Sequence, residues 1–121
     1  MFSNAPAVLR NATSGAVVAH SVGRATNPLT RGIGLLGRAR LSPDEGLWID
    51  GCSAVHTLGM RATLDLYFLD RDQRVVRIVA GVRPNRLAVT CRNAATVVEL
   101  GAVAEEGRAI ALGDRLVLEA A

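Results

Sequence analysis

Short apolar runs separated by turn-forming residues make up most of this chain, and the run at residues 64–69 is the clearest of them. Successive side chains of a β-strand point to opposite faces, so Leu64, Leu66 and Phe68 share one face of this run. The other three side chains, beginning with Asp65, share the opposite face. The pattern predicts a β-strand over these residues.

The rest of the chain repeats this arrangement of short strands and tight turns. A polar connection that ends in glycine, at residues 11–15, predicts that the N-terminal strands pair as a hairpin within residues 7–22. Residues 70–73 predict a second hairpin turn, which leads into a run rich in β-branched residues. The predicted strands cover residues 7–10, 16–19, 47–49, 64–69, 74–79, 96–100 and 115–118.

Helical signals are confined to two short segments. Asn27 and Pro28 form a helix start signal, and apolar residues then recur at helical spacing up to a predicted helix end near Gly37. Residues 102–107 predict one further helical turn. Many short strands with one or two short helices predict a mainly β fold, a jelly-roll-like β-sandwich or a partly open barrel. A length of 121 residues fits a single domain over residues 1–121.

The composition excludes several classes of protein, but it does not indicate a particular function. Half of the residues are hydrophobic and the net charge is only +3, which excludes an intrinsically disordered chain. No apolar run is long enough for a transmembrane helix, so no membrane partner is expected. All 14 basic residues are arginines, and they are scattered along a chain with few aromatic rings, so nucleic acid is not expected as a partner. The absence of lysine reflects either a GC-rich genome or the fit of guanidinium groups to planar anions.

The two cysteines, Cys52 and Cys91, are too few for a disulfide framework. The N-terminus has neither a basic start nor a long apolar core, so no signal peptide is expected. We therefore expect a cytoplasmic protein with reduced thiols, present as a monomer or a weak dimer.

A series of motifs in a fixed order resembles those of one bacterial and archaeal family, that of domain of unknown function 192. In chain order they are Gly34-Leu35-Leu36-Gly37-Arg38, Gly46-Leu47-Trp48-Ile49, Cys52-Ser53-Ala54-Val55-His56-Thr57, Met60-Arg61, Asp65, Phe68-Leu69-Asp70, Pro84 with Arg86, the segment 94–100 with Glu99, and Gly113-Asp114. The resemblance covers residues 26–118. It implies a compact, β-rich, jelly-roll-like sandwich without an established activity. Many of these relatives look exported, whereas no export signal is visible in this chain.

Three places depart from the pattern of the family. Leu58-Gly59 stand where two large aromatic residues are common, and Ala62-Thr63 stand where Phe-Pro is common. Asn85 replaces a tryptophan between Pro84 and Arg86. If these positions form a ligand-facing surface, this protein has lost part of it.

The segment 52–65 holds the densest set of reactive side chains. A thiolate nucleophile needs a base within hydrogen-bond reach and a group that fixes the tautomer of the base, and Cys52, His56 and Asp65 supply these types. They define one alternative, a cysteine- and histidine-dependent hydrolase. The opposing interpretation is structural, with Cys52 buried, His56 hydrogen-bonded in a loop, and Asp65 accepting bonds from backbone or from Arg61. No metal site is predicted, because the chain lacks four cysteine and histidine ligands at regular spacing.

The leading hypothesis is a small, soluble, non-enzymatic β-sandwich module that binds an unidentified small ligand or protein partner, without a cofactor. Its ligand-binding residues are expected among the residues that match the family motifs, most of them polar, namely His56, Thr57, Met60, Arg61, Asp65 and Arg86. Arg61 and Asp65 are expected to pair, or to bind an anionic ligand together with Arg86. Glu99 is expected at a solvated strand end.

Overall fold

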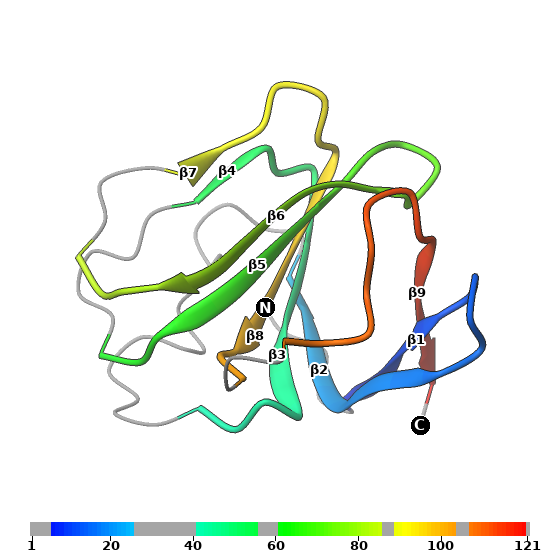
Figure 1. The fold of residues 1–121 in the computed structure, drawn as a ribbon, viewed down its shortest axis with the longest axis horizontal. Coiled ribbons are helices and arrows are strands. Elements are labelled where there is room, and N and C mark those ends of the chain that lie inside the picture. Colours follow the sequence, from blue (N-terminus) through cyan, green and yellow to red (C-terminus); the bar gives the residue numbers. More distant parts are fainter. Residues whose placement is uncertain (1–5, 26–40, 56–60, 86–88, 104–106, 121) are drawn as a thin grey trace.

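The protein folds around one seven-stranded mixed sheet, to which a small two-stranded sheet is added (Figure 1). The computed structural model describes residues 6–25, 41–55, 61–85, 89–103 and 107–120. The strands of the large sheet are β1 (Ala7–Asn11), β2 (Val17–Ala25), β3 (Glu45–Asp50), β5 (Leu64–Leu69), β6 (Val75–Val82), β8 (Thr96–Gly101) and β9 (Leu116–Ala120). They lie in the order β6-β5-β8-β3-β2-β1-β9, and all pairs are antiparallel except β2 with β3. The small sheet pairs β4 (Ala54–Val55) with β7 (Val89–Thr90).

The prediction of a mainly β fold is confirmed, and each predicted strand overlaps a strand of the large sheet. The N-terminal hairpin is also confirmed, because β1 pairs antiparallel with β2. The sequence did not indicate β4 and β7, since a strand of two residues shows no periodicity. The large sheet is not a closed barrel, and the finer assignment to a jelly-roll stays a prediction.

No helix occurs among the residues that the structure describes, and none there could cross a membrane. The predicted helix that ends near Gly37 falls in residues 26–40, outside the described part of the chain. The helical turn predicted at 102–107 falls partly outside it, and its described residues are not helical.

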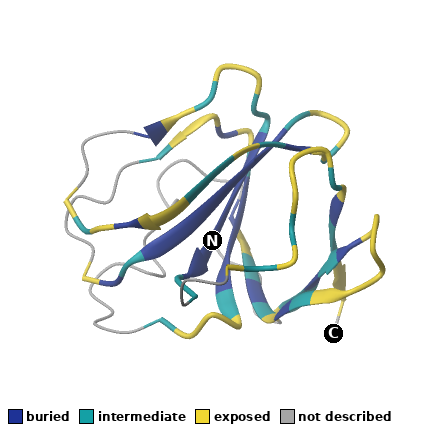
Figure 2. Ribbon diagram, in the orientation of Figure 1, coloured by how far each residue is buried: buried dark blue, intermediate teal, exposed yellow. Residues whose placement is uncertain are grey.

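Three adjacent strands, β5, β8 and β3, are buried on both faces of the large sheet (Figure 2). Leu64, Leu66 and Phe68 belong to one apolar cluster, whereas Tyr67 and Leu69 belong to another. The alternation predicted for this strand is therefore confirmed. The first cluster, which we call the outer cluster, also packs against β4 and β7. The second, the inner cluster, contains residues of β1, β2 and β9.

The large sheet curls until its two outermost strands meet at one point. Arg74, just before β6, forms an antiparallel bridge with Arg115, just before β9. The Val75 amide donates to the Asp114 carbonyl at 2.8 Å, and the Leu116 amide donates to the Gln73 carbonyl at 3.0 Å. This contact brings the turn between β5 and β6 against the start of the last strand. We call it the seam.

A buried ion pair holds the segment after β8 against the inner side of the sheet. The Arg108 side chain is 7% exposed and that of Asp65 is 3% exposed, with 2.6 Å between Arg108 Nη1 and Asp65 Oδ2. Arg108 Nη2 also donates to the carbonyls of Gly101, at 2.5 Å, and Pro43, at 2.7 Å. Asp65 accepts further bonds from the amides of Gly81 at 2.8 Å and Val103 at 3.1 Å. The pair thus joins β5, β6, the end of β8 and the turn before β3.

Replacing Arg108 with alanine should lower the free energy of unfolding by about 3–5 kcal/mol, because Asp65 would remain buried without its charged partner. Urea denaturation measures this loss. Arg24→Ala is the matched control, since it breaks an ion pair with Asp50 whose arginine is 55% exposed and should cost at most about 1 kcal/mol. Equal losses in the two variants would show that the Arg108 pair does not carry this role.

Candidate functional site

The predicted ligand-binding residues divide between the described and the undescribed parts of the chain. His56, Thr57, Met60 and Arg86 lie outside the described residues, so their roles stay predictions. Arg61 is exposed and Asp65 is buried. Asp65 also has a different partner from the one expected, because its carboxylate pairs with Arg108 instead of Arg61. Its bonds to backbone amides agree with the structural interpretation of this residue.

The two cysteines are both free thiols. Cys52 is 3% exposed and belongs to the outer cluster, and its Sγ donates to the Ala54 carbonyl at 3.0 Å. Asp65 lies on the opposite face of β5, where Arg108 and Tyr67 lie next to each other. Cys52 and Asp65, the two described members of the hydrolase hypothesis, are therefore separated by the sheet. This placement gives that hypothesis no support, and it stays a prediction.

Glu99 is the polar residue whose position differs most from expectation. We expected it at a solvated strand end, but only 4% of it is exposed, so that expectation was wrong. Strand β8 lies between β3 and β5, and the residues directly opposite Glu99 on these two strands are Leu47 in β3 and Leu66 in β5. Both leucines belong to the outer cluster, as does Val97 on the same face of β8. The carboxyl of Glu99 therefore lies on the outer, apolar face of the sheet.

The surroundings of Glu99 offer its carboxyl no polar partner among the described residues. Two residues further along β8, a Cβ on Gly101 would collide with the carbonyl oxygens of Leu41 and Ser42, so backbone lies directly against that position. Burial raises the pKa of Glu99 to about 7, with no compensating hydrogen bond or charge. The group consequently changes charge near neutral pH inside an apolar layer.

Such a carboxyl can do two things that a solvated one cannot. When protonated it can donate a hydrogen bond, and when ionised it can accept one from a ligand that replaces the missing solvent. A pKa close to neutrality also suits proton transfer. The sequence alone did not reveal this, because Thr96-Val97-Val98-Glu99-Leu100 reads equally well as a strand that ends in solvent. The one feature of the sequence that could have singled out Glu99 as a candidate site residue was its match to the family motif.

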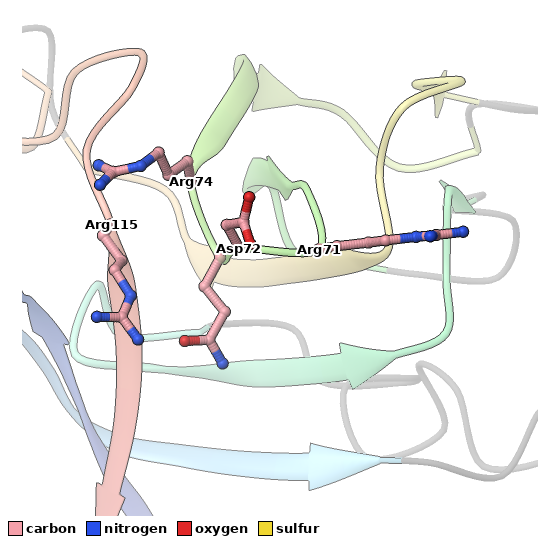
Figure 3. Close-up of a pocket in the computed structure, with 5 residues that line it drawn as sticks. Arg71, Asp72, Arg74 and Arg115 are labelled. Atoms are coloured by element: carbon pink, nitrogen blue, oxygen red, sulfur yellow. The ribbon is translucent and has the colours of Figure 1, made fainter.

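A second feature is a shallow polar hollow at the seam, with a volume of about 430 Å³ (Figure 3). Its lining residues are Arg71, Asp72, Gln73, Arg74 and Arg115. In the sequence these arginines are scattered, whereas the fold brings Arg115 beside Arg74. Among the described residues, no group of three or more His, Cys, Asp or Glu side chains could hold a metal ion.

The buried carboxyl makes a specific prediction about stability and pH. The folded-state pKa of Glu99 is raised from 4.5 to about 7, so its protonation favours the folded state. This contribution is complete below pH 4.5 and is lost as the pH rises through 7, a change of about 3 kcal/mol at most. Urea denaturation between pH 4.5 and 8.5 should therefore show a smaller loss of stability for Glu99→Gln than for the wild type. Parallel profiles would show that Glu99 titrates normally.

Comparisons with other proteins agree with the sequence resemblance. The sequence pattern of the family DUF192, described as "Uncharacterized ACR, COG1430", matches residues 9–118. No curated protein matches the chain.

Two solved structures have a similar fold. One, from Sinorhizobium meliloti 1021, is described as a "putative transcription regulator"; it is 28% identical, with a TM-score of 0.75 over 93% of this chain and 91% of its own. The other is a protein of unknown function from Novosphingobium aromaticivorans DSM 12444, which is 22% identical, with a TM-score of 0.76 over 92% of this chain and 83% of its own. The second likeness concerns the fold alone. Since the family pattern spans almost the whole sequence, this chain belongs to the uncharacterised family DUF192.

Proposed function

We propose that this protein is a small, non-enzymatic binding module, and that the carboxyl of Glu99 contacts its small ligand or protein partner. The observation that carries the proposal is a carboxyl that is 4% exposed, with no described partner and a pKa of about 7. A hydrophobic side chain would fill this place between Leu47 and Leu66 with less cost. Retaining a glutamate there costs stability, which is typical of a functional site.

The contrast with Asp65 supports this assignment. Asp65 is equally buried, but its carboxylate accepts three N–H groups, including one from Arg108. These bonds stabilise the fold, which explains why Asp65 is present, and they leave its carboxylate few free positions at which to accept a hydrogen bond from a ligand. Glu99 has no such structural task among the described residues. In this proposal Glu99 joins the predicted ligand-binding residues, and Asp65 acts as a positioning residue for the sheet.

The remaining residues of the predicted surface keep their proposed roles. His56, Thr57, Arg61 and Arg86 would supply polar contacts around the ligand, and Met60 an apolar one. The description of the Sinorhizobium protein supports a binding role in general, since a regulator acts through binding. The jelly-roll-like sandwich inferred from the family remains part of this proposal.

The proposal is tested by comparing Glu99→Met with Asp65→Asn. If Glu99 serves binding, the methionine variant should unfold at a higher free energy than the wild type at pH 8, by about 1–3 kcal/mol, because an ionised carboxyl is no longer buried. Asp65→Asn should lose stability, because it weakens the pairing with Arg108. Urea denaturation of both variants gives the comparison.

Binding is then measured by thermal shift with a panel of simple amines, amides and polyols, which offer the hydrogen-bond donors that an ionised carboxyl accepts. At least one compound should raise the melting temperature of the wild type and leave that of Glu99→Met unchanged. A loss of several kcal/mol in Glu99→Met at all pH values would make the carboxyl structural and would overturn the proposal. A panel that shifts both proteins equally would have the same consequence.

The hydrolase alternative has its own test. In the native protein Cys52 is 3% exposed, whereas Cys91 is partly exposed. Iodoacetamide should therefore modify Cys91 first and leave Cys52 unmodified until the protein unfolds. Mass spectrometry of tryptic peptides after brief labelling reads this order. Rapid alkylation of Cys52 in the folded protein would instead favour a catalytic thiol.

A further inference from the structure

We propose that the seam binds phosphate groups through Arg74 and Arg115, assisted by Arg71 and Arg92. This inference does not depend on the proposed role of Glu99. It rests on four arginines that come from three separate segments of the chain: the turn between β5 and β6, the loop between β7 and β8, and the start of β9. We call these four residues the seam arginines.

The backbone fixes the two central members of this group. Arg74 and Arg115 are partners in the antiparallel bridge that joins the two outermost strands, and backbone hydrogen bonds on both sides of it hold the contact. Figure 3 shows the two side chains on the same side of the hollow, whereas Arg71 extends in the opposite direction. Arg71 reaches an adjoining hollow of about 410 Å³, which Arg92 and Asn93 also line. A rigid backbone thus presents guanidinium groups to two neighbouring hollows.

Within the part of the chain that the structure describes, the seam arginines form no ion pair, unlike three other arginines. Among the described residues, Arg10 pairs with Glu119, Arg24 with Asp50 and Arg108 with Asp65. None of the seam arginines forms an ion pair with a described carboxylate. The guanidinium of Arg74 donates one bond to a described residue, from Nη1 to the Gly113 carbonyl at 3.0 Å, which leaves most of its five N–H groups available.

Acidic residues nearby limit the kind of ligand to a compact anionic group. Asp70 Oδ1 accepts the amides of Asp72 and Arg74, at 2.9 and 3.0 Å, and so closes the turn. Asp114 Oδ2 accepts the Ala111 amide and the Asn11 side chain, both at 2.9 Å, and these bonds lower the pKa of Asp114. Both carboxylates are engaged within the protein, which leaves Asp72 as the carboxylate facing both hollows. The local excess of positive charge is small, so the seam suits one or two phosphate groups better than a long polyanion.

The lining of the hollows points to the same ligand chemistry. The first hollow has no aromatic or aliphatic lining residue, and the second adds only Ala94 and Ala95 to polar side chains. No aromatic side chain lines either hollow, so the arginines are the groups that recognise the ligand, and they favour its anionic part. The planar fork of arginine matches two oxygens of a phosphate, which a lysine ammonium cannot do. The phosphate could belong to a small phosphorylated molecule or to a nucleic-acid backbone.

The test uses two probes that separate these sources: inorganic pyrophosphate and a short fluorescein-labelled DNA duplex. The proteins compared are the wild type, Arg74→Gln/Arg115→Gln, and the control Arg10→Gln/Arg24→Gln. The control loses the same charge from arginines that already pair with Glu119 and Asp50. Thermal unfolding verifies that both variants fold. Binding is followed by amide shifts in NMR spectra for pyrophosphate and by fluorescence anisotropy, at several salt concentrations, for the duplex.

Pyrophosphate should shift the amides of the seam, including those of Gln73, Gly113 and Arg115, in the wild type and the control. The seam variant should lose at least about tenfold in affinity, as expected for two charge-assisted contacts. Binding of pyrophosphate alone would indicate a small phosphorylated ligand. Binding of the duplex as well, with a salt slope that falls by about 0.9 for each phosphate contact removed, would indicate a nucleic-acid backbone. Failure of both probes to bind, or equal weakening in the control and the seam variant, would overturn the proposal.

Discussion

The buried pair of Arg108 and Asp65 is the contact on which the arrangement of this protein depends. A buried carboxylate near the start of β5 would be strongly destabilising without a charged partner, and Arg108 from the segment after β8 supplies that partner. Arg108 also donates hydrogen bonds to the carbonyl of Gly101, at the end of β8, and to that of Pro43, before β3. One side chain therefore fixes the course of a long connection, whose described residues have little regular structure. The last strand can then start at the seam, beside Arg74.

The two buried carboxyls on neighbouring strands show how environment decides the role of a residue type. Asp65 points to the inner face, where Arg108 and two backbone amides donate hydrogen bonds to its carboxylate. Glu99 points to the outer face, where Leu47 and Leu66 flank it, and its pKa rises to about 7. The first carboxyl stabilises the fold, whereas the second reduces stability at neutral pH. This asymmetry is the physical basis for assigning binding to Glu99.

Curling of the large sheet has a separate consequence at its outer strands. Strands that are distant in the sequence meet at the seam, and their arginines gather there without carboxylate partners among the described residues. The turns at the seam hold Asp70 and Asp114 in hydrogen bonds to the backbone. The guanidinium groups of the seam arginines are therefore available to a ligand, whereas the carboxylates of Asp70 and Asp114 accept hydrogen bonds within the protein. Turn formation and ligand recognition thus draw on different side chains of the same loops.

The sequence by itself determined the strands of the large sheet, the N-terminal hairpin and the alternation along β5, because these follow from the local periodicity of apolar residues. It also determined the family, through motifs in a fixed order. Tertiary structure alone decided that Arg108, and not Arg61, pairs with Asp65, that Glu99 is buried, and that Arg74 meets Arg115. Those outcomes depend on which strands become neighbours and on what covers each face. Periodicity reports the side of a strand on which a residue lies, but the partner on that side comes from a distant part of the chain.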